Sequence, residues 1–203
     1  MAPYISIGGY SDPPRIPHLS LEVNHSELVA LIGGPGSGKS DLMKCLAGIR
    51  KPVRDSIRIM GAKPGTMRSR DRSVFVFQNF NYAPDIFILT QLQQRISLIR
   101  GVPSRDVKDD VRDWCERMEL QDVCLKYPDK LNLSQLQLFS LAPVSLTSPS
   151  VVILDEPLRN VSASSVDSAL ALILPALENA AVLALVQKMS PLLEKADRIE
   201  TLR

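Results

Sequence analysis

The chain has 203 residues, of which 45% are hydrophobic and 23% are charged, an ordinary balance for a globular protein. Its formal net charge is only +2, so the overall charge does not predict binding to nucleic acid or to an anionic membrane surface. The short basic clusters at Arg50–Arg54 and Arg68–Arg72 are interpreted as solvated loops. Cys45, Cys115 and Cys124 lack paired spacing, which favours reduced thiols in a cytosolic protein.

The longest apolar stretches, Ala169–Leu177 and Ala180–Val186, fall short of the ~20 residues that a membrane-spanning helix needs. The N-terminus has no charged segment followed by an apolar run, so we expect no secretory signal. If the protein works at a membrane, we expect other chains to supply the spanning part.

The first third of the chain predicts strands around one helix. Leu28–Ile32 is a continuous apolar run that stops at a glycine, which is typical of a buried strand. Lys39–Gly48 has helical spacing of its apolar residues and reaches a glycine where a helix would end. Further strands are expected at Tyr4–Ile7, Leu19–Val23, Ser56–Met60 and Ser73–Phe77.

The middle third is predicted to be helical, from about residue 89 to residue 146. Asp106–Leu120 carries a regular apolar stripe, and Leu133–Leu146 is a second helix that Pro143 would kink or end. The last third alternates again, with strands at Val151–Leu154, Ala181–Val186 and Arg198–Leu202, and helices at Ser164–Leu174 and Pro191–Lys195.

A phosphate-binding loop follows the Leu28–Ile32 strand and leads into the first predicted helix. It matches the pattern G-x-x-x-x-G-K-[ST] with the residues Gly33, Gly34, Pro35, Gly36, Ser37, Gly38, Lys39 and Ser40. Glycines let the backbone approach phosphate oxygens, and successive N–H groups meet the positive end of the helix. Lys39 can bridge the β- and γ-phosphates, and the Ser40 hydroxyl can ligate Mg²⁺. The loop therefore predicts binding of ATP with Mg²⁺, and Asp41 is counted with the nucleotide-contacting residues.

Two acids, Asp155 and Glu156, end the apolar strand at Val151–Leu154, about 115 residues after the phosphate loop. Asp155 would hold Mg²⁺ directly or through water. Glu156 would orient and polarise the attacking water. Two acids after a strand are weak evidence alone, but at this distance from a phosphate loop they predict the second half of an ATP site.

These features predict an α/β fold with a P-loop NTPase core, a mixed and mainly parallel sheet, and an inserted α-helical subdomain. The core is expected at about residues 1–84 and 150–203, and the helical subdomain at about 85–149. Together they would form one domain over residues 1–203.

The chain resembles the nucleotide-binding domain of ABC (ATP-binding cassette) proteins over nearly its whole length. Val74–Gln78 is similar to the family's strand and Q-loop, and Ile88–Leu98 to the start of its helical subdomain. Tyr127–Leu131 resembles the run into the family's signature, and Ala196–Ile199 the segment before its last core strand. The order and spacing of these segments carry the resemblance.

The resemblance implies roles for Tyr10 and Gln78. Tyr10 stands where the family has an aromatic residue that stacks on adenine, and Gln78 would reach Mg²⁺ and the attacking water. Each residue also has an ordinary interpretation, as a core or surface tyrosine and as a solvated glutamine at a strand end. The implied catalytic residues are Lys39, Gln78 and Glu156, and the implied metal ligands are Ser40, Gln78 and Asp155.

The sequence departs from the family at the signature, which usually reads Leu-Ser-Gly-Gly-Gln. This chain has Leu131, Asn132, Leu133, Ser134 and Gln135 there. The resemblance implies that the signature acts on the γ-phosphate bound by an opposing subunit, so a leucine adds bulk where backbone should approach phosphate. Asn132 can still cap a helix. An alternative alignment that starts the signature at Leu133 also lacks the glycines.

Other departures concern hydrolysis. Pro143 replaces a frequent arginine, Ser162 the D-loop aspartate, and Lys188 the switch histidine. Lys188 can neutralise phosphate charge but cannot accept a hydrogen bond as a neutral imidazole would.

Two functions remain open from the sequence. The first is an ATP-binding subunit of an ABC-type membrane complex that binds Mg-ATP and hydrolyses it to drive or gate transport. Its partners would be integral membrane subunits and a second ABC ATPase subunit, in a homodimer or a heterodimer, at the inner face of a membrane. The alternative is a nucleotide-binding regulatory or scaffold subunit with little or no hydrolysis. A partnership with nucleic acid is not expected.

Overall fold

The computed structural model describes residues 2–52, 56–70, 72–79 and 81–202, so Arg54 and Asp71 of the two basic clusters lie outside the described residues. The chain forms two compact units. Unit 1 comprises Met1–Gln78, Pro149–Glu156 and Leu177–Arg203, and unit 2 comprises Asn79–Ser148 and Pro157–Ala176. No helix within the described ranges is both long and apolar enough to cross a membrane.

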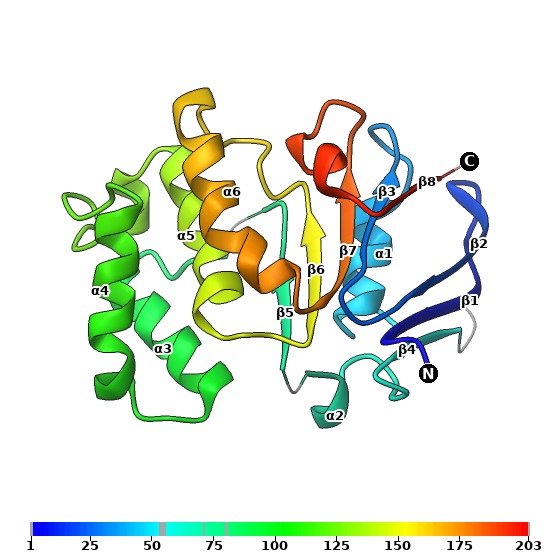
Figure 1. The fold of residues 1–203 in the computed structure, drawn as a ribbon, viewed down its shortest axis with the longest axis horizontal. Helices are drawn as coiled ribbons and strands as arrows, with labels where there is room; N and C mark the ends of the chain where they lie inside the picture. Colours follow the sequence, from blue (N-terminus) through cyan, green and yellow to red (C-terminus); the bar gives the residue numbers. More distant parts are fainter. Residues whose placement is uncertain (1, 53–55, 71, 80, 203) are drawn as a thin grey trace. The chain divides into compact units, whose positions relative to one another are not determined.

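Unit 1 contains a parallel sheet of five strands in the order β5-β6-β7-β3-β8 (Figure 1). The strands are β3 Leu28–Ile32, β5 Ser73–Val76, β6 Val151–Asp155, β7 Ala181–Val186 and β8 Arg198–Thr201. Every residue of β6 and β7 is buried, which explains their continuous apolar runs because both faces of a parallel sheet are covered. The parallel order brings the carboxyl ends of these strands to one edge.

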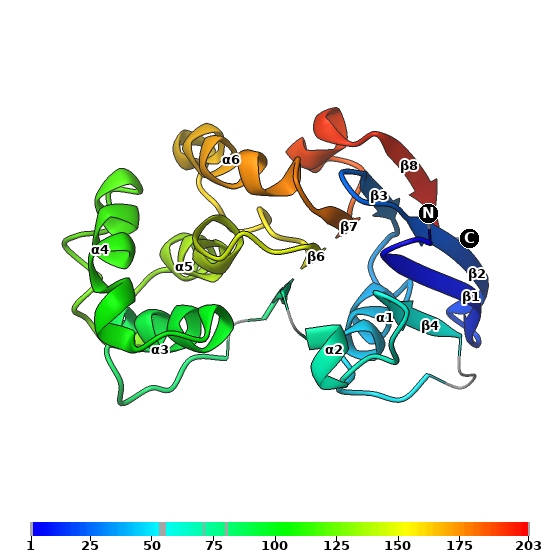
Figure 2. The same ribbon diagram turned by 60° about the horizontal axis from the view of Figure 1, so that its bottom comes forward.

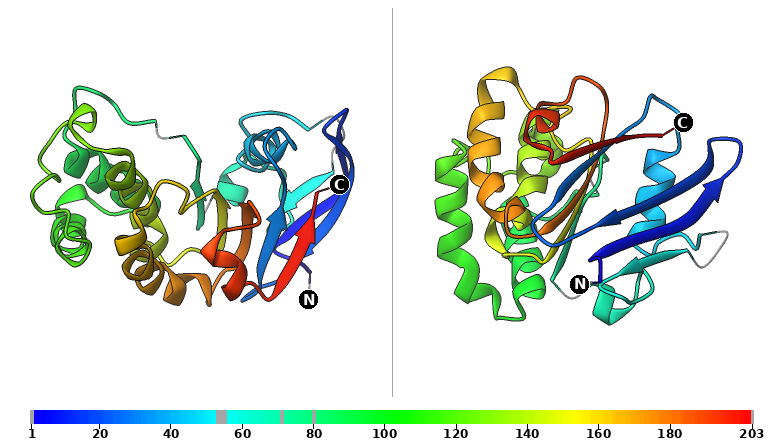
Figure 3. Two further views of the ribbon diagram at one scale, coloured as in Figure 1. Left: turned by 90° about the horizontal axis from the view of Figure 1, so that it is seen from above. Right: turned by 45° about the vertical axis from the view of Figure 1, so that its right-hand side comes forward.

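Unit 1 also contains an antiparallel sheet of three strands in the order β2-β1-β4. These strands are β1 Ile5–Asp12, β2 Ile16–Val23 and β4 Ile57–Ile59. Helix α1, Lys39–Leu46, lies between the two sheets, and its apolar side chains join both in one core (Figure 3). Unit 1 is completed by α2 Met67–Arg70 and the 3₁₀ helix η3 Pro191–Lys195.

Unit 2 is helical. Its elements are α3 Ile88–Arg100, η1 Ser104–Val107, α4 Lys108–Arg117, η2 Pro128–Lys130, α5 Leu133–Leu146 and most of α6 Ala163–Leu177. Helices α3, α4 and α5 pack on one another (Figure 2). The rings of Trp114 and Phe139 lie 6.0 Å apart at the centre of this packing, and both side chains are almost fully buried.

The sheets and helices confirm the predicted α/β class, with some differences in detail. Helix α5 has the predicted bounds, Leu133–Leu146, and Pro143 does not end it. The predicted helix at 106–120 begins as a 3₁₀ turn, because η1 precedes α4. Residues 157–176, which were predicted to lie in the core, group with the helical unit. All three cysteines are free and buried, including Cys45 as expected for a residue on the apolar face of α1.

Candidate functional site

The phosphate loop connects β3 to α1 at the carboxyl edge of the parallel sheet. Its first residue is tied to the sheet, because the Gly33 N–H donates to the carbonyl of Val186 at 3.1 Å. Gly38 has a left-handed backbone, with φ of 91°, and a Cβ atom on it would lie only 3.0 Å from the side chain of Ile16. Glycine is required there by both its conformation and its surroundings.

The interior of the loop is shaped for an anion. A Cβ atom added to Gly33 would clash with the Ser37 hydroxyl. That hydroxyl is buried and has no hydrogen-bond partner among the residues that the structure describes. A buried polar group without a partner is costly, so a phosphate oxygen would relieve that cost. The loop therefore fits the triphosphate that its sequence predicts.

Lys39 is turned into the loop. Its side chain is 7% exposed, and its ammonium donates to the carbonyl of Gly33 and, at 3.2 Å, to that of Gly34. The same Nζ lies 3.6 Å from Glu156 Oε1. A buried ammonium next to the N-terminus of α1 provides the positive charge that phosphates need.

Ser40 and Asp155 meet beside the loop. The Ser40 hydroxyl donates to Asp155 Oδ2 at 3.0 Å, and Asp155 is 2% exposed at the end of β6. A hydroxyl and a carboxylate in contact are the hard oxygen ligands that Mg²⁺ prefers, with room for waters and phosphate in its other positions. The structure thus brings together two of the three predicted metal ligands.

Glu156 has an unusual backbone for a residue other than glycine, with φ of 50°. Its N–H donates to the carbonyl of Leu185 at 3.0 Å, which holds the side chain at the carboxyl edge. Its Oε1 is buried and accepts no hydrogen bond from the described residues. Strained backbone of this kind persists where the surrounding structure enforces it, often at functional sites.

Gln78 is half-buried and lies two residues beyond the end of β5. Because β5 pairs in parallel with β6, Gln78 follows its strand at the same edge where Asp155 ends β6. Its position is consistent with the predicted role, but its contact with a metal or a water stays a prediction.

Tyr10 is not brought to the phosphate loop. It pairs with Leu19 of β2, is 1% exposed, and has its hydroxyl 3.8 Å from Cys45 Sγ inside the core. Burial raises the pKa of Tyr10, and the pKa of Cys45 is raised for the same reason. A ring enclosed in this way cannot stack on a base, so the structure supports the ordinary interpretation of Tyr10 as a core residue.

The Asp41 carboxylate forms ion pairs with basic side chains. Its carboxylate lies 2.6 Å from Arg15, 3.2 Å from Arg50 and 3.7 Å from Lys44. Arg50 also contacts Asp12 at 3.0 Å, and this pairing raises the pKa of Arg50. Since a carboxylate repels phosphate, a nucleotide contact by this side chain is not expected. Arg50 was expected in a solvated loop and Arg15 had no predicted role, because no motif marks ion pairs between distant segments.

The signature stretch, Leu131–Gln135, lies in unit 2 at the start of α5. Asn132 caps the helix: its side chain accepts from the Gln135 N–H at 2.9 Å, and the Gln135 side chain accepts from the Asn132 N–H at 3.0 Å. The Ser134 hydroxyl accepts from the Ser162 N–H at 2.9 Å. Leu133 is 63% exposed. The polar side chains of Asn132, Ser134 and Gln135 therefore already have hydrogen-bond partners within unit 2.

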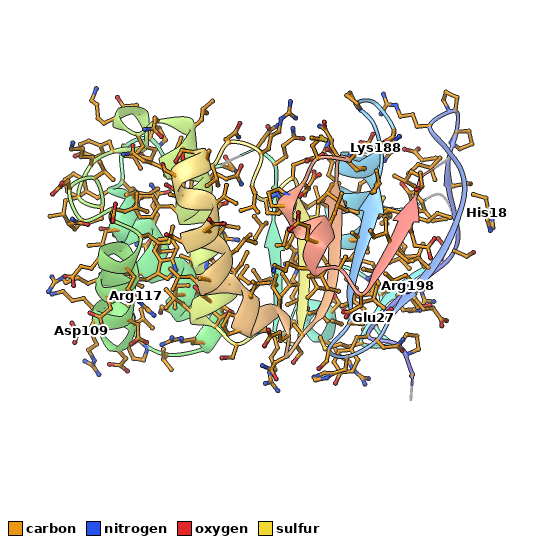
Figure 4. All side chains as sticks on the ribbon, turned by 45° about the horizontal axis from the view of Figure 1, so that its top comes forward. His18, Glu27, Asp109, Arg117, Lys188 and Arg198 are labelled. Carbon is orange, nitrogen blue, oxygen red and sulfur yellow. The ribbon has the colours of Figure 1, made fainter. Side chains whose placement is uncertain are left out.

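Lys188 lies on the exposed turn that follows β7 in unit 1 (Figure 4). It is two residues beyond Val186, whose carbonyl holds the first glycine of the phosphate loop. Its approach to bound phosphate stays a prediction.

Comparisons with known proteins agree with this geometry. The sequence profile of the family described as ABC transporter matches residues 16–159. An uncharacterized ABC transporter ATP-binding protein of Mycobacterium tuberculosis is 30% identical over 194 residues, which cover 92% of this chain and 78% of that protein. The ABC transporter ATP-binding protein YtrE of Bacillus subtilis is 27% identical and covers 82% of this chain and 74% of its own length.

Solved structures show the same fold. A bacterial ABC transporter cassette, solved as a dimer, has a TM-score of 0.84 at 19% identity and covers 98% of this chain and 94% of its own. An ATP-binding subunit of an ABC transporter has a TM-score of 0.84 at 17% identity, with coverage of 98% and 86%. The fold and the loop define a P-loop ATPase. The chain belongs to the ABC transporter family, and by family it is an ATP-binding ATPase subunit of a transport complex.

Proposed function

We propose that this chain binds Mg-ATP in unit 1 and uses it to drive or gate a transport complex at the inner face of a membrane. The observation that carries the proposal is the Ser40–Asp155 contact of 3.0 Å beside the buried Lys39. Ser40, Asp155 and Gln78 would hold Mg²⁺, and the loop N–H groups and Lys39 would hold the phosphates. A bound Mg²⁺ would neutralise charge on the β- and γ-phosphates.

Glu156 is proposed to accept a proton from the attacking water. Its Oε1 is buried, lies close to Lys39 and has no competing hydrogen bond among the described residues. Gln78 would orient that water from the neighbouring strand end. Lys188 would add positive charge near the γ-phosphate, without the proton-accepting nitrogen of an imidazole.

A second cassette and separate membrane chains are proposed as partners. The names of the relatives support this, because Mesostigma viride CysA, 31% identical over 69% of this chain, is a sulfate/thiosulfate import ATP-binding protein. Unit 2 offers a surface for such a chain, with a cavity of about 310 Å³ that Tyr82, Arg95 and Leu98 help to line.

The signature stretch, whose polar side chains are already hydrogen-bonded, favours a heterodimer. In that pairing, the phosphate loop of this chain would face an intact signature on its partner, and its own signature would serve the other site poorly. The same observation also favours the second function, a regulatory subunit with little hydrolysis.

The variant Glu156→Gln tests the proposal, with binding and hydrolysis of Mg-ATP measured on the same samples. We expect both chains to bind Mg-ATP, binding to weaken when Mg²⁺ is withheld, and hydrolysis to fall roughly 10²-fold in the variant because a general base is lost. Glu178→Gln, which changes an exposed carboxylate, is the matched control. If the native chain binds Mg-ATP but hydrolyses it no faster than the variant, hydrolysis by the isolated chain is contradicted.

A further inference from the structure

The turn that joins β1 to β2 packs against the end of the phosphate loop. The Arg15 N–H donates to the carbonyl of Asp12 at 3.0 Å, which closes this turn. A Cβ atom on Gly38 would lie 3.0 Å from Ile16 and 3.4 Å from the Cβ of Arg15. Arg15 is therefore next to the last glycine of the loop, within the same unit.

The direction of the loop fixes which end of a nucleotide would meet this turn. The γ-phosphate end is defined by Lys39, which reaches back to the carbonyl of Gly34 and to Glu156. The α-phosphate and the nucleoside must leave from the other side, past the start of α1. Arg15 and Asp41 lie at that side, because their 2.6 Å ion pair joins the turn to the first turn of α1.

The Arg15 side chain is held by an ion pair but remains exposed to solvent. One of its terminal nitrogens donates to Asp41 Oδ2, while its side chain remains 55% exposed. Asp41 is itself fixed by Arg50 at 3.2 Å and is only 19% exposed. A guanidinium held along one edge keeps its flat face available, and this face stacks well on aromatic rings.

No aromatic residue can take this place in the turn. Its residues from Ser11 to Ile16 are Ser, Asp, Pro, Pro, Arg and Ile. Tyr10, the aromatic residue before them, is enclosed in the core at 1% exposure.

We propose that Arg15, positioned by Asp41, stacks on the purine base of the bound nucleotide. This inference rests on the proposed binding of Mg-ATP and names the residue that binds its base. A stack covers the face of a purine without reading its edge groups, so the site accepts Mg-GTP about as well as Mg-ATP.

Isothermal titration of Mg-ATP, Mg-GTP and Mg-tripolyphosphate tests the proposal on the native chain, Arg15→Ala and Arg15→Lys. Tripolyphosphate has the phosphates but no base. We expect Arg15→Ala to bind both nucleotides about tenfold more weakly and tripolyphosphate within about twofold of the native chain. Arg15→Lys keeps the charge without the planar group, and we expect it to resemble Arg15→Ala.

Arg68→Ala is the matched control, because it removes an exposed arginine of α2 in the same unit and leaves the ion pairs of Asp41 in place, and we expect a change below about twofold. Native affinity for ATP in Arg15→Ala, or an equal loss for ATP and tripolyphosphate, would overturn the proposal. So would full ATP affinity in Arg15→Lys, or a native chain that binds GTP ten times more weakly than ATP. A native chain that binds none of the three ligands would instead contradict the proposed function itself.

Discussion

The phosphate loop of unit 1 and the signature stretch of unit 2 both lie at the start of a helix. They differ in whether their polar side chains already have hydrogen-bond partners. In the loop, the Ser37 hydroxyl is buried without a hydrogen-bond partner among the described residues. In the signature stretch, Asn132 and Gln135 bond to each other, and Ser134 bonds to Ser162.

This difference supports the proposal that the chain supplies the phosphate-loop half of an ATP site. Leaving polar groups buried and unsatisfied costs stability, and a ligand with complementary charge removes that cost. A helix whose first residues cap it is stabilised by those hydrogen bonds. The groups that form the cap are then less available to bind a phosphate of another subunit. We therefore propose that the chain is organised to bind its own nucleotide and poorly organised to complete the site of a partner.

The largest effect expected is that of Lys39→Ala on the loop. Removing a buried ammonium that would bond to phosphate should weaken Mg-ATP binding by about 100-fold, since hydrogen bonds of charged groups contribute about 1.5–3 kcal/mol. Titration with a fluorescent ATP analogue measures this loss.

Lys195→Ala is its control, because it removes an exposed lysine of η3 in the same unit, to which no role in nucleotide binding is assigned. We expect this variant to bind ATP within a few-fold of the native chain. An equal loss in both variants would mean that general positive charge, rather than the buried Lys39, binds the phosphates.

A smaller effect is expected at the signature stretch. Asn132→Ala removes the helix cap and should lower the free energy of unfolding by about 1 kcal/mol. Asn132→Ser keeps a capping oxygen and should lower it by only a few tenths. Urea denaturation compares the two, with Mg-ATP affinity expected to stay native in both. If Asn132→Ala is as stable as the native chain, the proposed self-capping does not stabilise α5.

The local parts of this account could be predicted from the sequence. The loop and the acids at the end of β6 are short patterns next to continuous apolar strands, and these patterns need no distant contact to be recognised. The capping of α5 by Asn132 was foreseen in the same way. Pro143 was less predictable, because a proline loses one hydrogen bond but the packing of α5 can still carry the helix past it.

The predictions that required knowledge of distant contacts were weaker. Tyr10 follows Gly9, whose φ of 69° accompanies a shift in the β1–β2 register, and the sequence did not show that this shift places the ring in the core. The ion pairs of Asp41 with Arg15 and Arg50 join residues from separate elements. No periodicity or motif encodes such pairs, so only the structure could reveal them.

The central claim is that the departures in the signature stretch limit ATP hydrolysis. Its most direct test asks whether a restored signature, supplied by another copy, activates the nucleotide site of the native chain. The helper copy carries Lys39→Ala, which blocks its own site, with Asn132→Ser, Leu133→Gly and Ser134→Gly, which restore the signature. A second helper carries Lys39→Ala alone. We predict that the restored helper raises ATP hydrolysis per native chain at least about tenfold, because preorganised donors to a transition state are worth 10²–10³ in rate. Equal rates of ATP hydrolysis with the two helpers would contradict the claim that the altered signature limits hydrolysis.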